Sequence, residues 1–308
     1  MNENNTKPTP PLNPYFALLS GVLAVSTGAI FARLADAPAL VIAAYRVGLA
    51  TLVLVPFAWW RARDELKSLT LRDLKLAMMS GFFLAFHFAT WISSLDYTSV
   101  TNSVVLVNTN PLWVGLLTPF ITRDRIRAGV VASIIISVAG GTIIAAGDFA
   151  SGGKAIWGDC LALIGSISAA IYLLIGRNLR QKLSLLAYVL VCYGCAAVIL
   201  WTIVISLNLQ VTGFSPKTIK ALWAMALITQ MIGHTSYNWA LKWFSAGLIA
   251  VSLLGEPVGS TILAYLIFDE GLTWTKVIGG TLVLSAIYIA GVSETNTSFK
   301  TQPPGVQG

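Results

Sequence analysis

Charged residues are scarce in this chain of 308 residues. Asp, Glu, Lys and Arg together make up 11% of it, against about 25% in an average soluble domain. A soluble fold of this size covers its surface with polar side chains, and here there are too few. The scarcity excludes an ordinary soluble enzyme, a nucleic-acid-binding domain and a disordered chain. Apolar residues of the AVILMFWYC set reach 56% and the mean hydropathy is +0.75, so we expect an integral membrane protein.

Motifs of common enzymes are also missing. The chain has two histidines in all, too few for the H-E-x-x-H zinc motif together with a further histidine ligand, and it contains no G-x-S-x-G and no P-loop. The three cysteines, Cys160, Cys192 and Cys195, lie inside apolar runs, and their odd number does not make a disulfide framework. We therefore expect no catalytic residue, no metal site, no cofactor, no nucleic-acid partner and no ATP-driven step.

Long apolar runs are what the sequence does contain. A membrane-spanning helix needs about 20 mostly apolar residues, and continuous rather than alternating apolar runs exclude a β-barrel. The run after the polar first thirteen residues is long enough to span, so it is interpreted as an uncleaved first helix. Ten spans are predicted, at residues 14–34, 38–60, 73–94, 97–120, 127–146, 156–176, 183–207, 219–243, 246–269 and 274–292.

Basic residues fall mainly in alternate loops. With the N-terminus in the cytoplasm, fourteen Lys and Arg residues lie on the cytoplasmic side and five outside, while Arg46 lies within a span. Cytoplasmic loops carry the excess of Lys and Arg in membrane proteins. We expect a multi-pass protein of the cell (inner) membrane with cytoplasmic tails at 1–13 and 293–308.

The chain also resembles two copies of a five-span unit. Asn110-Pro111 matches Glu256-Pro257 at an offset of 146 residues, and His87 matches His234 at an offset of 147. These matches predict a first repeat at 14–146 and a second at 156–292, joined by a loop at 147–155. Because five is odd, the second copy would be inverted, as in secondary transporters with a substrate site near the midplane. Chance similarity among apolar helices is the alternative.

Glu256 and Arg46 are charged residues inside predicted spans, where a charge is costly. Glu256 is near mid-depth and is followed by Pro257, which interrupts helix hydrogen bonding as Pro111 does in the first half. Two interpretations of Glu256 are open: a proton-linked or cation-recognising group, or a hydrogen-bonded brace for the kink. Arg46 could extend to the membrane surface, pair with Glu256 as its charge partner, or bind a substrate carboxylate.

Polar and aromatic side chains form stripes on otherwise apolar helices. His87 and Trp91 are four residues apart in the third span, and Gln230, His234 and Asn238 share that spacing in the eighth. Helical residues at this spacing lie on one face. We expect these stripes to line a substrate cavity, with interhelical hydrogen bonding as the alternative. Further cavity candidates are Asn102 and Asn110 in the fourth span and Tyr172 in the sixth.

Several segments resemble the EamA-type transporters of the drug/metabolite transporter superfamily. The matching segments are His87-Phe-Ala-Thr-Trp91, Asn110-Pro111-Leu-Trp113, Gly233-His234, Asn238-Trp239 and Leu254-Gly255-Glu256-Pro257, and the resemblance covers roughly residues 16–292. It implies an all-α membrane protein of ten transmembrane helices in two inverted five-helix repeats. In the first half, Asn110 replaces the glutamate before the proline, so a symmetric carboxylate pair is not expected.

The resemblance implies a carrier of small metabolites, often an exporter, and not an enzyme. We expect a secondary transporter of a small organic metabolite, such as an amino acid or a related solute, that alternates access about a midplane cavity. Its partners would be a small-molecule substrate, the lipid bilayer and, as candidate coupling ion, the proton. An intramembrane enzyme or sensor that uses the buried Glu256 and the histidines is the alternative, and a passive channel is a third hypothesis.

Overall fold

The computed structural model describes residues 10–121, 128–146, 153–269, 271 and 273–300, and within these ranges the chain forms helices and no strands. Parts of the predicted tails (1–9 and 301–308) and most of the predicted connecting loop (147–152) lie outside the described residues. So do four of the basic residues counted above, which are Lys7, Arg123, Arg125 and Arg127.

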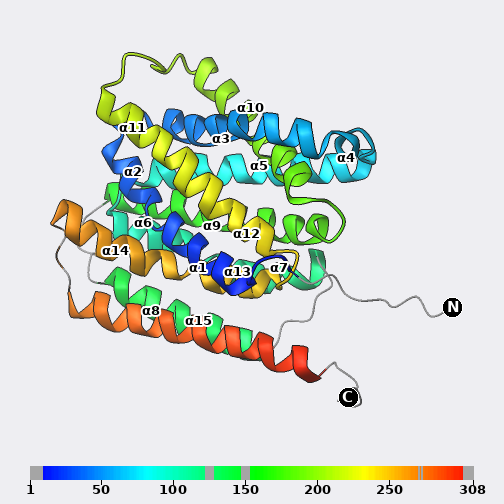
Figure 1. The fold of residues 1–308 in the computed structure, drawn as a ribbon. Coiled ribbons are helices and arrows are strands. Elements are labelled where there is room, and N and C mark those ends of the chain that lie inside the picture. Colours follow the sequence, from blue (N-terminus) through cyan, green and yellow to red (C-terminus); the bar gives the residue numbers. More distant parts are fainter. Residues whose placement is uncertain (1–9, 122–127, 147–152, 270, 272, 301–308) are drawn as a thin grey trace.

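Fifteen α-helices and one π-helix make up the described chain (Figure 1). They are α1 (Pro14–Val25), α2 (Gly28–Leu34), α3 (Ala39–Arg61), α4 (Arg63–Lys67), α5 (Leu71–Ser94), α6 (Val100–Val107), α7 (Asn110–Ile121), α8 (Ala128–Ala146), α9 (Gly153–Arg180), α10 (Leu185–Ser206), α11 (Pro216–Ala224), η1 (Met225–His234), α12 (Thr235–Ala240), α13 (Ala246–Leu253), α14 (Gly255–Phe268) and α15 (Trp274–Lys300).

Seven stretches of the described chain are long and apolar enough to cross a membrane. They are Pro14–Leu34, Ala39–Arg61, Leu71–Ser94, Ser103–Ile121, Lys154–Arg180, Leu185–Ser206 and Ala246–Phe268. Of the other predicted spans, 127–146 and 274–292 contain the shorter apolar stretches Ala128–Gly140 and Val277–Ala286. The remaining one, 219–243, is divided among α11, η1 and α12. The chain is therefore an all-helical membrane protein, while a count of ten spans is not established by these helices.

Three of the spanning stretches are interrupted, one after Val25, between α1 and α2, and two next to a proline. The chain leaves the helix after Val107 and re-enters it at Asn110, and it does the same between Leu253 and Gly255. Pro111 and Pro257 lie in the first turns of α7 and α14. The first N–H groups of a helix have no partner within it, so a proline there loses no helix hydrogen bond. The helix is thus interrupted just before each proline, by two residues between α6 and α7 and by Leu254 alone between α13 and α14.

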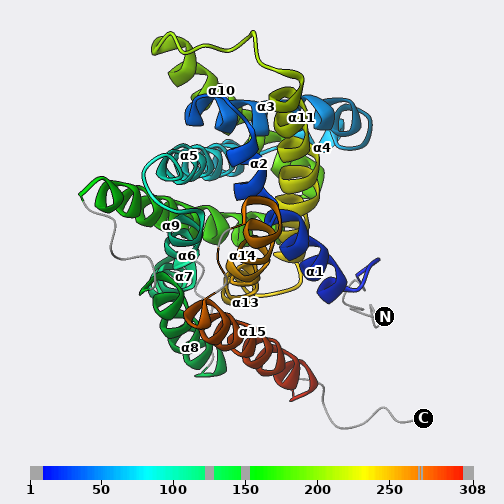
Figure 2. The same cartoon turned by 90° about the vertical axis from the view of Figure 1, so that its left-hand side faces the viewer.

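The helices are arranged in layers. Helices α3, α5 and α10 pack together at one side of the molecule, and α8 and α15 pair at the opposite side (Figures 1 and 2). Helix α9 crosses between them and packs on α5, α6 and α7. The broken helices and η1 therefore meet in the middle of the bundle.

Small residues let the helices approach closely around one of the breaks. A Cβ atom built on Gly259 of α14 would lie 2.7 Å from the Cβ of Ser26, which follows α1. Real Cβ atoms do not approach other atoms this closely, so α14 depends on a glycine here. Gly255 and Gly259 are four residues apart, the spacing of small residues that permits close helix packing in membranes.

Candidate functional site

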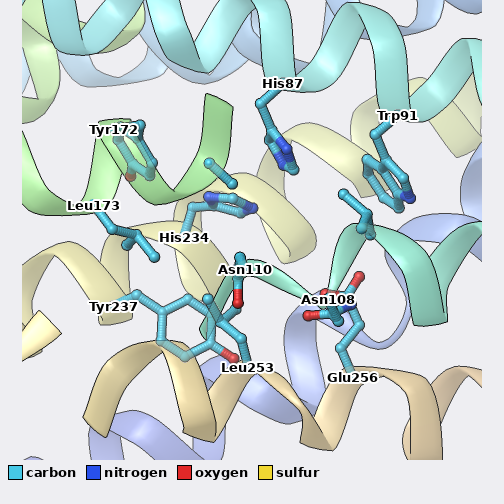
Figure 3. Close-up of a pocket in the computed structure, with 12 residues that line it drawn as sticks. His87, Trp91, Asn108, Asn110, Tyr172, Leu173, His234, Tyr237, Leu253 and Glu256 are labelled. Carbon is cyan, nitrogen blue, oxygen red and sulfur yellow. Dashed lines mark hydrogen bonds between the residues drawn. The ribbon is translucent and has the colours of Figure 1, made fainter. Parts of the chain in front are cut away.

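A cavity of about 30 Å³ lies where the broken helices face α5, α9 and η1. His87 and Trp91 project from α5 toward His234, Asn110 and Glu256 (Figure 3). A site of this volume holds a few water molecules, whereas pockets for organic ligands measure about 300–1,000 Å³. The lining residues are His87, Trp91, Val107, Asn108, Asn110, Ala169, Tyr172, Leu173, His234, Tyr237, Leu253 and Glu256.

Glu256 connects the two helix breaks. It is the second residue of α14, with 8% of its surface exposed, and its Oε2 accepts a hydrogen bond of 3.3 Å from Asn108 Nδ2. The same Nδ2 donates to the carbonyl of Val104 at 2.9 Å. Asn108 lies in the gap between α6 and α7, so one amide joins the first break to the carboxylate at the second.

The two histidines face each other across the cavity. Their ring centroids are 6.2 Å apart, and His87 is stacked on Trp91 with centroids 5.9 Å apart and an interplanar angle of 6°. The Nδ1 of His87 lies 3.0 Å from the carbonyl oxygen of Gly165 in α9. If that nitrogen carries the proton, it donates to the carbonyl and Nε2 is left as an acceptor.

Three fully buried polar atoms of the lining residues have no hydrogen-bond partner among the described residues. They are Trp91 Nε1, Asn110 Oδ1 and the hydroxyl of Tyr237. Buried polar atoms are nearly always hydrogen-bonded, and an unsatisfied one is costly. In this conformation the three atoms have almost no accessible surface, so a polar molecule in the cavity would reach them only after side chains move.

Arg46 and Gln230 lie next to the cavity but do not line it. Arg46 is fully buried in α3, its Nε donates a 2.9 Å hydrogen bond to Gln230 Oε1, and its Cζ is 4.0 Å from the centroid of Phe88. Among the described residues, Arg46 and Glu256 form no ion pair within 4.0 Å. The predicted pairing of the two charges is therefore absent from this conformation.

Asn238 belongs to a hydrogen-bond network instead of the cavity wall. Its Oδ1 accepts from the hydroxyl of Tyr172 at 2.8 Å, and its Nδ2 donates to the hydroxyl of Tyr193 at 2.9 Å. Gln230 lies inside the π-helix η1 and Asn238 lies beyond it in α12, and neither residue lines the cavity. The eighth-span stripe is consequently divided, with His234 alone at the cavity. The side chain of Asn102, another predicted lining residue, lies outside the described part.

Basic side chains at the end of α9 bind main-chain carbonyls at the end of α12. Arg180 Nε donates to Asn238 O at 2.9 Å, and Arg177 Nη1 donates to Leu241 O at 2.7 Å. Gln181 Nε2 also reaches Leu241 O, at 3.2 Å. Cations favour the C-terminal ends of helices, where carbonyls are unpaired. We call this set of contacts the α9–α12 latch.

Sequence reasoning missed two polar lining residues, Asn108 and Tyr237. On a continuous helix, Asn108 would face about 200° away from Asn110. The restriction that a proline places on the residue before it was the available signal for a break next to Asn110. Tyr237 had no such signal, because aromatic residues are frequent throughout the apolar runs. No group of three or more His, Cys, Asp or Glu in the described residues is placed to hold a metal ion.

Taken together, apolar spanning helices, two of them broken at a shared polar cavity, define a class: helical membrane proteins whose buried site lies between discontinuous helices. The particular family follows from comparison with known proteins. Residues 12–146 and 156–292 each match the EamA-like transporter family, and the chain belongs to that family.

Similar proteins include an uncharacterized transporter of Archaeoglobus fulgidus, 26% identical over 256 residues that cover 80% of this chain and 86% of the relative. An uncharacterized transporter of Clostridium kluyveri is 26% identical over 239 residues, covering 74% of this chain and 75% of the relative. A protein of known crystal structure superposes with a TM-score of 0.73 at 17% identity, over 92% of this chain and 98% of that one. That last likeness concerns the fold alone.

Proposed function

We propose that this protein is a secondary transporter that exports a small organic metabolite, such as an amino acid or a related solute, by alternating access about the cavity. One observation carries the proposal: the hydrogen bond between Asn108 and Glu256 joins two broken helices at the cavity wall. Secondary transporters bind substrates and coupling ions where discontinuous helices meet.

The cavity would lie between two inverted five-helix halves, at residues 14–146 and 156–292. The separate family matches to 12–146 and 156–292 support two related halves. The breaks also occur at corresponding places, since α6 and α13 begin 146 residues apart and both end before an Asn-Pro or Gly-Glu-Pro sequence. Ten membrane crossings and cytoplasmic tails at 1–13 and 293–308 belong to the same proposal, as does a location in the cell (inner) membrane.

Glu256 is the proposed coupling group. An ionised carboxylate enclosed by protein at mid-membrane is costly, and Asn108 is its single hydrogen-bond partner among the described residues. Binding of a proton, or of a cationic group, offsets that cost. Asn110 holds the corresponding position before Pro111 and does not titrate, so one coupling site per carrier is expected.

Reconstitution tests the proposal. The purified protein is placed in liposomes preloaded with an unlabelled amino acid, and entry of the same radiolabelled amino acid is followed by counterflow across a panel of amino acids. We expect saturable, time-dependent accumulation of at least one of them, with the labelled solute chemically unchanged by mass spectrometry. Protein-free liposomes are the control.

Three outcomes would contradict the proposal. Flux that rises without saturation indicates a channel, chemical conversion of the solute indicates an enzyme, and no accumulation of any amino acid removes the proposed substrate class. Export is tested separately, by comparing inside-out with right-side-out vesicles in a proton gradient. Faster uptake into inside-out vesicles is expected.

A further inference from the structure

The guanidinium of Arg46 is buried with most of its hydrogen-bonding capacity unused. The side chain has 0% exposure, and Nε is bonded to Gln230. Neither Nη1 nor Nη2 has a hydrogen-bond partner among the described residues. These two nitrogens form one edge of a planar fork, the edge that binds carboxylates with two parallel hydrogen bonds.

Two aromatic rings lie close to the guanidinium but do not neutralise its charge. Its Cζ lies 4.0 Å from the centroid of Phe88 and 5.6 Å from that of Trp91. Contacts of a cation with ring faces stabilise the charge, but ring faces are poor hydrogen-bond acceptors. The N–H groups on the Nη edge therefore remain to be satisfied.

The nearest candidate counter-charge, Glu256, is held elsewhere. It is bonded to Asn108 and is not within 4.0 Å of Arg46, although the two charges interact electrostatically. Buried cations are normally paired with an anion. The guanidinium of Arg46 is buried, is oriented by Gln230 and has no partner on its Nη edge. It is therefore suited to bind an anion that comes from outside the protein.

Trp91 connects this site to the cavity. It lines the cavity with His87 and His234, and its ring also contacts Arg46. In the present conformation Arg46 is not part of the cavity wall, and its Cζ lies 5.6 Å from the centroid of the Trp91 ring. A cavity of about 30 Å³ must widen to admit any organic solute, and movement of Trp91 would open the cavity toward the Nη edge. The unpartnered Nε1 of Trp91 supplies a further donor there.

We propose that Arg46 is the anion receptor of the transport site and that it binds the carboxylate of the solute through Nη1 and Nη2. This inference rests on the proposed function, because it names the chemical class of the transported solute: small organic monocarboxylates. A single buried cation matches a single negative charge. A phosphate dianion would leave an excess negative charge close to Glu256, so the geometry favours a carboxylate.

The test compares acids with amides of the same shape. Purified wild-type protein in detergent is titrated with acetate, propionate, benzoate and phenylacetate, and with the four corresponding amides, while melting temperature is recorded against concentration. Inorganic phosphate is a separate arm. We expect at least one carboxylate to bind about tenfold or more tightly than its amide, since charge-assisted bidentate hydrogen bonds are among the strong ones.

Variants assign the preference to a residue. Arg46→Gln should abolish the preference for acid over amide, and Arg46→Lys should retain part of it because the charge remains but the fork is lost. Arg33→Gln is the matched control, since Arg33 is exposed on α2, and it should bind like the wild type. If both Arg46 variants fail to fold, the wild-type comparison of acids with amides still decides.

Four carboxylates that bind no better than their amides would overturn the inference, and so would tighter binding of phosphate than of every carboxylate. A preference that persists in folded Arg46→Gln would also overturn it. The proposed function is tested independently by flux. Acid-selective binding without flux in liposomes would contradict transport and leave the anion site in place, whereas saturable flux without acid selectivity would contradict the anion site alone.

Discussion

Asn108 Nδ2 and Glu256 Oε2 lie 3.3 Å apart although 148 residues separate them in the chain. Each residue stands at a helix break, so the contact ties the end of one broken helix to the beginning of another. A bond of this kind holds the cavity wall together, and it also occupies the carboxylate that we propose as the coupling group. Its two roles can be separated by experiment.

Glu256→Gln should affect transport more than folding. A glutamine keeps the shape of the side chain, and its carbonyl oxygen can still accept from Asn108. We expect nearly unchanged expression and melting temperature, with counterflow or uptake that is abolished or no longer varies with pH between 5 and 8. Normal transport with an unaltered pH profile would reduce Glu256 to a brace for the break before Pro257, and a variant that does not fold would show the carboxylate to be structural.

Cysteine accessibility should follow the cavity and not the helical stripe. In a background without Cys160, Cys192 and Cys195, we expect cysteine at 87, 110 or 234 to react with a small water-soluble thiol reagent under transport conditions. Cysteine at 238 should be protected, because Asn238 lies in the tyrosine network.

Phe86→Cys is the matched control for that experiment, since residue 86 adjoins His87 on α5 but is exposed on the outside of the bundle, where lipid excludes the reagent. Reaction at 86 and 238 together with protection at 87, 110 and 234 would show that the cavity assignment is wrong.

Asn238→Ala should lower stability. The change removes the hydrogen-bond partner of the Tyr172 hydroxyl and one of two partners of the Tyr193 hydroxyl, which keeps Thr235. Interhelical hydrogen bonds in membrane proteins contribute about 0.6 kcal/mol each on average and up to about 1.7, so a loss of about 1–2 kcal/mol is expected, measured as a fall in melting temperature in detergent. Thr202→Ala, which removes an exposed hydrogen bond within α10, is the control and should change little.

Gly259→Ala should disturb the packing of α14 on the segment after α1. The added methyl group would overlap Ser26, and overpacking of a filled interior costs about 1–3 kcal/mol. Gly194→Ala is the control, because the nearest atom to its added Cβ would be at 3.8 Å. Equal melting temperatures of the two variants would contradict the close contact of α14 with Ser26.

Reporter fusions test the orientation. A fluorescent protein fused to the C-terminus should be bright and alkaline phosphatase at the same place inactive, since fourteen of the basic residues fall on the proposed cytoplasmic side. The ends of α3 and α15 lie at the same end of the bundle (Figure 1), which agrees with cytoplasmic locations for both. An active phosphatase with a dark fluorescent fusion would reverse the orientation.

Much of the cavity could be anticipated because polar groups inside apolar runs are rare. His87, Trp91, Asn110, Tyr172 and Glu256 are polar or amphipathic residues of predicted spans, and the structure brings all five to the cavity. Their role in binding remains a prediction. Placement failed for Gln230 and Asn238. Both were expected at the cavity with His234, but Gln230 is bonded to Arg46 and Asn238 to Tyr172 and Tyr193, and helical spacing does not reveal such partners.

Contacts across the bundle could not be derived from the sequence at all. The bond from Arg46 to Gln230 and the network of Asn238 join residues at sequence separations of 184, 66 and 45. Nothing in local periodicity selects those partners among the many polar residues of other spans. The separation of Arg46 from Glu256 could not be derived from the sequence either. The sequence shows that both charges are unusual inside a span, but the distance between them depends on how the helices pack.

The α9–α12 latch is chemically one-sided, and this has a consequence for sequence variation. Side chains of Arg177, Arg180 and Gln181 are the donors, whereas the acceptors are main-chain carbonyls of Asn238, Leu241 and Lys242. Every amino acid supplies a carbonyl, so the exposed Lys242 can change without loss of these bonds, whereas Leu241 is fully buried and is also held by its packing. Substitution of Arg180 has no such freedom. Related transporters that keep the latch should accordingly vary at the position of Lys242 and retain a strong donor at the end of α9.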